Sequence, residues 1–415
     1  MPNVDSQSRN QSLDGLRGLA IIAVVIHHGT LTSSDLTSWF REWNSVISLG
    51  FFGGQLFLTL SGYFMTVTLL NARRDSRSIG SVYATRMIRL APLYWIVFVL
   101  TCLVQPFAYQ FLTGRSAGNF IPQWDSAAFY AFFSANISIA LHGFQSPFDV
   151  TWTLAVQEQF YLLWIPAIYF LPRSWHVRLG VFVLLFSILA RPIAFASGIS
   201  PTTIHVLTPF RMDAIAVGGL VAIAQLTGWV PSKMTGIGTL VASLAFLIVL
   251  TLFPHQGSTW HPVVGYTAMD VLSYLWLASM LIVPSTSFAG RLLSIPALRW
   301  YGRHSYAIYL LHMPTFSGLY AVYWFLIARH SPENSTAMAR VAIGFFNVVA
   351  CIPIAWLAWR IVERPMEKCK DRLRKRAELP VYCPAPDTKK IASSERPTQI
   401  DVTPVSAPQT VASIR

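Results

Sequence analysis

Ionisable side chains interrupt several long apolar stretches of this chain, where such groups are costly and are therefore candidates for chemistry. The first stretch carries Asp14 and Arg17 near its start. Two adjacent histidines, His27 and His28, stand near its end. Eleven residues of helix would place Arg17 and His28 on one face, about 16 Å apart along the axis, with Asp14 one turn before Arg17 and able to pair with it. Because an imidazole ordinarily titrates near neutral pH, this face predicts a polar pathway that ends in a general base, His28, with His27 as its rival.

A pair of arginines, Arg86 and Arg89, precedes another apolar run. Because they are three residues apart, they are neighbours on one helical face. Two guanidinium groups so placed can bind a phosphate through several donors, although charge that only marks one side of a membrane explains them as well. Ser61 and Tyr63 stand in the glycine-rich run 51–64, where packing explains the glycines and the role of Ser61 stays open.

Three long polar side chains, Gln157, Glu158 and Gln159, follow one another inside an apolar run. Packing does not account for such a group at membrane depth, so we expect a catalytic or hydrogen-bonding role for Gln157 and Glu158. The nearby residues that could bind or support an acceptor are Asp149, Trp152 and Tyr161.

Later apolar runs contain Arg211, Asp213 and His312. Arg211 and Asp213 are two positions apart and do not face each other on a helix, so each is predicted to find its partner on another helix. His312 lies two turns into a helix rich in tyrosine. All three are candidates for acceptor binding or for support of the site.

The composition indicates which elements must position these residues. Of 415 residues, 53% are hydrophobic and only 12% are charged, with a mean hydropathy of +0.48, whereas about a quarter of a soluble domain is charged. These values exclude a disordered chain, a soluble α/β enzyme and a nucleic-acid-binding domain, and they predict an all-α polytopic membrane protein. The four cysteines are widely spaced, so neither a disulfide framework nor a metal site is expected: Cys102, Cys351, Cys369 and Cys383.

The number of membrane-spanning helices follows from the length of the apolar runs, because about 20 residues of helix cross a bilayer core of about 30 Å. Ten runs meet this length: 14–33, 48–70, 90–112, 152–171, 179–198, 206–226, 235–253, 264–284, 304–328 and 340–361. A shorter run, 126–141, carries Asn136 and predicts a re-entrant or interfacial helix within a long outer loop, 113–150. Loops of that length are often functional, so this one is a candidate lid.

The distribution of positive charge predicts the orientation of these ten helices. With the N-terminus inside, fifteen Lys and Arg fall on the inner side before the tail and four fall in the outer loops, which is a strong positive-inside bias. We therefore expect a cytoplasmic arm at residues 1–12, a membrane domain at 13–365 and a basic, disordered cytoplasmic tail at 366–415. The net charge of +13 then marks the cytoplasmic face and not a nucleic-acid partner.

Six motifs, in order along the chain, resemble the membrane-bound acyltransferase-3 family. They are LDGLRGLA at 13–20 with His28 beyond it, FFGGQLFLTLSGYF at 51–64, RMIRLAPLYW at 86–95, WTLAVQEQFY at 152–161, YGRHSYAIYLLH at 301–312 and RIVERPMEK at 360–368. The resemblance implies a ten-helix inner-membrane enzyme that moves an acyl group, commonly acetyl, from cytoplasmic acyl-CoA to a hydroxyl. In that family the acceptor is usually a sugar of a surface or secreted glycan, and in some members a small molecule.

The resemblance also implies roles for particular residues. The arginine and histidine of the family's first helix correspond to Arg17 and His28, its paired arginines to Arg86 and Arg89, and its S-G-F/Y motif to Ser61, Gly62 and Tyr63. The fourth motif departs from the family pattern W-S-L-x-x-E-x-x-F-Y, because Thr153 replaces the serine and Gln157 the glutamate. Gln157 can keep a hydrogen bond but cannot act as a base, so we expect it to position another group, or else Glu158 substitutes for the missing carboxylate.

Combined, these observations predict a membrane O-acyltransferase. Acyl-CoA, in the first instance acetyl-CoA, would place its phosphates near Arg86 and Arg89, with Ser61 and Tyr63 on the donor side. The thioester would then reach the face of Arg17 and His28. The expected acceptor is a glycan, a lipid-linked sugar or a small hydroxylated molecule, and membrane lipid is the remaining partner. Direct transfer and an acyl-enzyme on Ser61 or Tyr161 both stay open.

Two other classes of function compete with this hypothesis. A transporter or flippase for an acylated product would also carry buried charges and broken helices, but it predicts inverted repeats, and the order of motifs shows none. A signalling receptor would use the basic tail as a docking segment and would leave the intramembrane charges unexplained.

Overall fold

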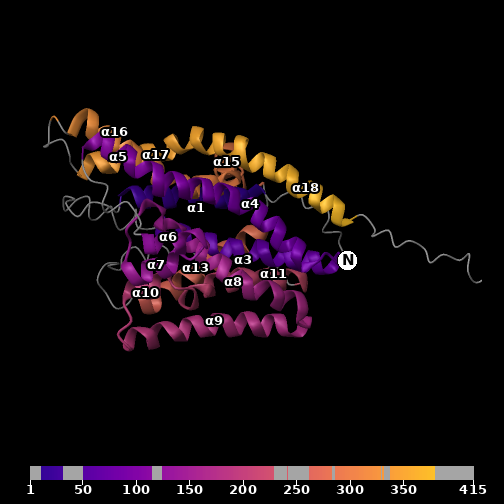
Figure 1. Ribbon diagram of the computed structural model, residues 1–415. Coiled ribbons are helices and arrows are strands. Elements are labelled where there is room, and N and C mark those ends of the chain that lie inside the picture. The colour runs from indigo at the N-terminus through magenta and orange to yellow at the C-terminus, as the bar shows by residue number, and fades with distance from the viewer. Residues whose placement is uncertain are drawn as a thin grey trace, which may run out of the picture.

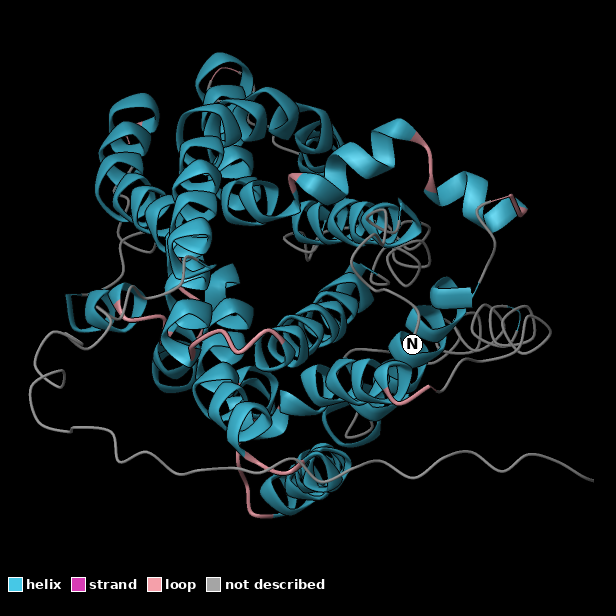
Figure 2. Ribbon diagram, turned by 90° about the vertical axis from the view of Figure 1, so that its right-hand side faces the viewer, coloured by secondary structure: helices cyan, strands magenta, loops and turns pink. Residues whose placement is uncertain are grey.

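The computed structural model describes residues 11–30, 50–114, 124–228, 241, 261–282, 286–328, 330 and 337–378. Within these ranges the regular structure is helical and contains no strand, as the composition predicts (Figure 2). The longer helices are α1 (Gln11–Thr30), α3 (Gly50–Arg74), α4 (Ile79–Val99), α8 (Trp152–Phe170), α9 (Arg173–Ala196), α11 (Met212–Leu226), α13 (Tyr266–Ile282), α16 (Ser305–Tyr323), α17 (Ala337–Ala358) and α18 (Arg364–Glu378). The shorter ones are η2 (Leu100–Val104), α5 (Gln105–Thr113), α6 (Trp124–Ala131), α7 (Ala135–His142), η3 (Pro147–Thr151), α10 (Pro201–Val206), η4 (Thr208–Phe210), η5 (His261–Gly265), α14 (Phe288–Leu293), α15 (Pro296–Arg303), η6 (Trp324–Ala328) and η8 (Trp359–Glu363).

The chain is a multi-pass membrane protein. Six of its described helical segments are long and apolar enough to cross a bilayer: Phe52–Arg74, Ile79–Ala108, Arg173–Ala196, Val263–Leu281, Ser305–Ala328 and Met338–Arg372. Nine of the ten runs predicted from the sequence fall on described helices, and the tenth, 235–253, lies outside the described residues. The total of ten spans and the cytoplasmic placement of both ends stay predictions.

The run 206–226 does not form the single helix that its hydropathy predicts. It consists of the end of α10, the 3-10 turn η4 and the helix α11. Leu207 is extended, with φ −78° and ψ 139°, and Pro209 in the turn lacks the backbone N–H that a continuous helix needs. This break leaves Arg211 just before the first residue of α11, where its side chain can reach other helices.

The run 126–141 likewise forms two short helices, α6 and α7, and not one re-entrant or interfacial helix. Phe133 has a φ of 55°, in the left-handed region that ends a right-handed helix. Its ring stacks on Tyr94 at a centroid distance of 4.1 Å, which helps to hold this uncommon conformation. Asn136, at the start of α7, is fully buried and exchanges hydrogen bonds of 3.1 and 2.9 Å with Gln159.

Close helix packing explains Gly53 and Gly62 of the second motif but not Gly54, where an added Cβ would meet no atom within 4 Å and which lines the cavity described below. A Cβ at Gly62 of α3 would lie 2.0 Å from the carbonyl oxygen of Ile215, and one at Gly218 of α11 would lie 1.8 Å from that of Thr59. Only glycine permits this approach of two backbones, as is common between membrane helices. The packing interpretation of Gly62 is therefore confirmed, and it fixes how α3 and α11 present their polar side chains.

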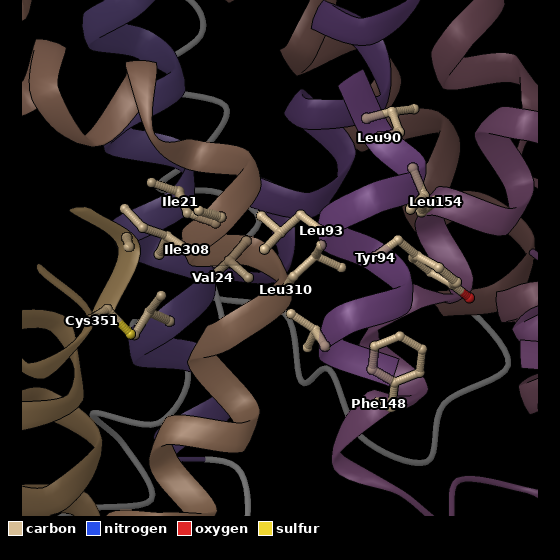
Figure 3. Packing of buried hydrophobic residues seen from close by; sticks show 14 of the residues in the cluster. Ile21, Val24, Leu90, Leu93, Tyr94, Phe148, Leu154, Ile308, Leu310 and Cys351 are labelled. Carbon is tan, nitrogen blue, oxygen red and sulfur yellow. The ribbon is translucent and has the colours of Figure 1, made fainter. Parts of the chain in front are cut away.

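A large hydrophobic cluster of the described residues lies where α1, α4, α16 and α17 meet. Figure 3 shows Ile21 and Val24 of α1 beside Ile308 and Leu310 of α16, with Cys351 of α17 close to them. All five side chains are at most 5% exposed. This core fixes the rotation of α1 against α16. It therefore also fixes the direction of the polar residues one turn later on each helix, His28 on α1 and His312 on α16.

The two ends of the bundle differ. Helices α6, α7 and α10 lie at one end, and α18 extends from the other (Figure 1). Residues 364–378 are helical although a disordered tail was expected from residue 366. The physical reason is continuity: α17 passes through the π-helical segment η8 into α18, so α18 extends an existing helix and needs no nucleus of its own. Residues 379–415 lie outside the described part of the chain.

Candidate active site

A cavity of about 1480 Å³ runs among the helices. Ten of the residues singled out from the sequence lie in its wall: Asp14, Arg17, His28, Ser61, Arg86, Arg89, Asp149, Trp152, Gln157 and Arg211. Five others lie behind that wall: Tyr63, Glu158, Tyr161, Asp213 and His312. The structure therefore gathers residues from distant motifs around one space.

One part of the wall is rich in cations and comes from the end of the bundle where α18 begins. We refer to it as the basic end, and its charged residues are Arg17, Arg89, Arg303, Glu363, Glu367 and Lys370. Arg17 donates a 2.8 Å hydrogen bond to the Ser305 hydroxyl at the start of α16. Arg89 is exposed at this end and interacts with the Glu363 carboxylate.

The opposite part of the wall is aromatic, and we refer to it as the aromatic end. It contains Phe144, Trp152 and His205. The rings of Trp152 and His205 are 4.5 Å apart, and His205 Nδ1 lies 2.7 Å from the Tyr266 hydroxyl. Phe144 is 55% exposed, so this end presents an apolar ring surface to a molecule that enters from outside.

Arg86 and Arg89 do not act as the equivalent pair that their spacing suggests. Arg86 makes an ion pair with Glu158 of α8, through Nε at 2.9 and 3.0 Å and through Nη2 at 2.5 Å. Its guanidinium also lies over the ring of Tyr161, 4.2 Å from the centroid. Arg86 is thus held by α8, whereas the Arg89 guanidinium is exposed at the basic end.

A hydroxyl chain lies beside this ion pair. Tyr161 donates a 2.9 Å hydrogen bond to Ser61, and Ser61 donates a 2.6 Å hydrogen bond to the side-chain oxygen of Gln157. An amide oxygen accepts such a bond but cannot take the proton away. The contact agrees with the positioning role expected for Gln157, because this residue fixes where the Ser61 hydroxyl points.

The two histidines of the first helix both line the cavity. His28 contacts a third histidine, because its Nδ1 lies 3.0 Å from Nε2 of His312. His312 is fully buried on α16 and stands behind the wall. This contact gives His28 a polar partner that can orient its ring.

Arg211 and Asp213 find their partners on other helices, in agreement with their spacing. Arg211 donates to Gln55 of α3 at 2.5 Å and lies over the ring of Tyr266 at 3.9 Å. Asp213 pairs with Arg191 of α9, and both side chains are completely buried. The network continues from Gln55 to Asp270 of α13, so Arg211 reaches the cavity from a buried group of charges that spans four helices.

Asp149 belongs to the structural frame of the aromatic end. Its carboxylate accepts hydrogen bonds from the Tyr130 hydroxyl and from the backbone N–H groups of Gln145 and Ser146, and it completes a capping box with Ser146. Burial raises the pKa of Asp149, and these hydrogen bonds offset part of that rise. Asp149 therefore secures the turn η3, which delivers Trp152 to the cavity.

Three residues that bond to residues of the site were not among the candidates predicted from the sequence: Arg191, Asp270 and Tyr309. Asp270 and Arg191 stand inside predicted spans, so the rule that intramembrane charges are functional candidates would have found them. Tyr309 carried no such signal. Its hydroxyl lies 2.8 Å from Thr153 Oγ1 and donates a 2.5 Å hydrogen bond to the Val150 carbonyl, which joins α16 to the start of α8.

Taken together, the fold and the site define a class: a multi-pass helical membrane protein with a cavity that joins a cation cluster to a histidine. Residues 10–357 match the family described as an acyltransferase domain. The chain belongs to this family of membrane acyltransferases.

Relatives in the same class carry related names. The chain is 26% identical over 373 residues to the peptidoglycan O-acetyltransferase OatA of Listeria monocytogenes, which covers 86% of this chain and 56% of the relative. It is 26% identical over 318 residues to a putative peptidoglycan O-acetyltransferase, YrhL, of Bacillus subtilis, covering 73% and 48%. It is 24% identical over 377 residues to a putative O-acetyltransferase of Staphylococcus aureus, covering 86% and 57%. The chain thus spans about half the length of these relatives, and no solved structure matches it significantly.

Proposed function

We propose that this protein is an integral membrane O-acyltransferase that moves an acyl group, in the first instance acetyl, from acyl-CoA to a hydroxyl of a glycan. One observation carries the proposal: Arg17 near the basic end and His28 deeper in the bundle line the same cavity. A donor with a polyanionic head and a long arm needs these two features, a cationic mouth and a base some distance within. Membership of the acyltransferase family supports the same reaction.

The basic end suits the head of acyl-CoA. Guanidinium and ammonium groups bind phosphate oxygens through charge-assisted hydrogen bonds, and Arg89, Arg303 and Lys370 supply such groups there. Because the positive-inside bias places the loops that bear Arg89 and Arg303 in the cytoplasm, acyl-CoA would enter from that side. The pantetheine arm would then extend along α1 for the roughly 16 Å of helix between Arg17 and His28.

The transfer itself needs a base and no further reactant, because a thioester is already activated. His28 takes the proton from the acceptor hydroxyl, and the oxygen attacks the thioester carbonyl carbon. The new C–O ester bond forms as the C–S bond breaks, and the departing thiolate of CoA receives the proton. Arg17 and the hydroxyl chain of Ser61 lie along the cavity wall that the thioester would pass.

The aromatic end suits the acceptor. Sugar rings present C–H faces that stack on aromatic side chains, and Phe144 and Trp152 offer such surfaces at the aromatic end, with Arg211 over the Trp152 ring. Two of the relatives are named as peptidoglycan O-acetyltransferases, one of them putatively, so a cell-wall glycan is the acceptor class that we propose.

The experiment is acyl transfer by purified protein in lipid nanodiscs. Acetyl-CoA is supplied with and without soluble glycan fragments, and free CoA thiol and acetylated sugar are measured together. We expect CoA release that requires the glycan, with turnover lost by about 10²–10⁴-fold in His28→Ala and largely retained in His27→Ala. No CoA release with any acyl-CoA, or full turnover in His28→Ala, contradicts the proposal.

A further inference from the structure

Backbone carbonyls and the contact between the two rings together determine where the protons of His28 and His312 lie, because His28 also hydrogen-bonds the Val24 carbonyl one turn earlier on α1. His312 Nδ1 faces two backbone carbonyl oxygens of its own helix, that of Tyr309 at 2.7 Å and that of Ile308 at 3.2 Å. A carbonyl oxygen only accepts hydrogen bonds, so His312 Nδ1 carries a proton. In the neutral ring, Nε2 of His312 is then left with its lone pair.

The position of the proton on the His28 ring follows in the same way. Its Nδ1 lies 3.0 Å from that lone pair, so Nδ1 of His28 is the donor of this hydrogen bond. A neutral imidazole holds one proton, which leaves Nε2 of His28 as an unprotonated acceptor. The two nitrogens lie on different sides of the ring, and His312 stands behind the cavity wall while His28 lines it. The basic nitrogen is therefore the one free to meet a hydroxyl in the cavity.

The contact remains favourable after His28 has accepted a proton. An imidazolium still donates through Nδ1, and a donor that carries positive charge makes a stronger hydrogen bond to the same acceptor. The bond from His28 to His312 thus becomes stronger as the base takes up its proton. Asn347 of α17 supports this arrangement by donating a 2.8 Å hydrogen bond to the backbone carbonyl of His312.

We propose that His312 is a positioning residue for the transfer reaction: its Nε2 fixes His28 in the tautomer whose Nε2 is the base. The inference rests on the proposed function, in which His28 removes the acceptor proton. His312 itself does not touch the substrate, because it is fully buried and outside the cavity wall.

Two substitutions at this position separate the role from simple packing. His312→Gln places an amide oxygen near the position of Nε2 and keeps an acceptor for His28. His312→Leu fills similar volume with no acceptor. We expect kcat in His312→Leu to fall by at least about tenfold, toward the 10²–10⁴-fold of a lost general base, with the KM for acetyl-CoA unchanged, and to recover substantially in His312→Gln.

His176→Gln is the matched control. His176 is another buried histidine that bonds a backbone carbonyl, at the start of α9 and away from the cavity wall, so its replacement should leave kcat unchanged. If His312→Leu keeps kcat within about twofold of the parent while His28→Ala is inactive, the inference is wrong and the proposed function stands. If His28→Ala is fully active, the proposed function is wrong.

A second measurement does not depend on activity. Solid-state NMR of the parent protein in lipid, with ¹⁵N-labelled histidine, reports which nitrogen of each ring carries the proton. The His28 signal is identified by its absence from the His28→Ala spectrum. We expect a protonated Nδ1 and a bare Nε2 on His28, and a protonated Nε2 on a neutral His28 overturns the inference.

Discussion

Ser61 donates a 2.6 Å hydrogen bond to the side-chain oxygen of Gln157 and receives one of 2.9 Å from Tyr161. These contacts commit the proton of each hydroxyl to a defined acceptor. Because the final acceptor is an amide oxygen, the chain can hold Ser61 in place but cannot remove its proton. The glutamine in the fourth motif therefore has a structural consequence: Ser61 is oriented and not activated.

Substitutions at Gln157 test this conclusion. Gln157→Glu keeps an oxygen that accepts from Ser61, so we expect turnover within about tenfold of the parent. Gln157→Leu leaves the Ser61 hydroxyl without its acceptor, which costs about 1–3 kcal/mol, and turnover should fall clearly below that of Gln157→Glu. CoA release measures both. Equal turnover in Gln157→Leu and the parent would show that the contact has no role.

The ion pair of Arg86 and Glu158 predicts a strong coupling between the two residues. Both side chains are about 15% exposed, so removing one partner leaves a largely buried charge, at a cost of about 3 kcal/mol. We expect Arg86→Met and Glu158→Gln each to lower the thermal stability of the purified protein, and the double variant to be less destabilised than the sum. Additive effects in this double-mutant cycle would contradict the prediction. Stability is the readout because Arg86 also lines the cavity.

Gly62→Ala should destabilise the packing of α3 against α11. The added methyl group would lie 2.0 Å from the Ile215 carbonyl oxygen, and overpacking of this kind costs about 1–3 kcal/mol or more. Gly318→Ala in α16 is the matched control, because its methyl group meets no atom within 4 Å and alanine favours helix. Thermal unfolding in detergent compares the two. A stable Gly62→Ala would show that the helices can separate there without cost.

Tyr130→Phe should lower stability more at pH 7 than at pH 4. Burial raises the pKa of Asp149, and the Tyr130 hydrogen bond offsets part of this rise. A carboxyl whose pKa is higher in the folded than in the unfolded state binds protons more tightly when the protein is folded. The free energy of unfolding therefore falls as pH rises above the usual pKa of aspartate. Loss of the Tyr130 hydroxyl raises the pKa of Asp149 further and increases that penalty, by about 1–3 kcal/mol at neutral pH. Unfolding temperatures of both proteins at the two pH values measure the difference, and a pH-independent difference would argue against this origin.

Local chain properties account for what was predictable in the fold. Within the described residues the long apolar runs form helices, and the breaks in runs 206–226 and 126–141 trace to single residues. Pro209 accompanies the break between α10 and α11, and Phe133 ends α6 in a left-handed conformation. The proline is a recognisable signal. The positive φ of a phenylalanine is not, because it depends on the ring of Tyr94 that stacks on it.

Composition and the length of the apolar runs were enough to predict the all-helical membrane class and most of the polar residues of the cavity. Both follow from the cost of exposing polar backbone or burying charge in a bilayer, which composition and run length already express. Only the tertiary structure decided which of these residues meet. Arg17 bonds Ser305 across 288 positions and His28 bonds His312 across 284, because such pairs depend on how each helix is rotated against its neighbours. That rotation is set by the glycine contacts and hydrophobic clusters between helices, and no spacing within one helix contains it.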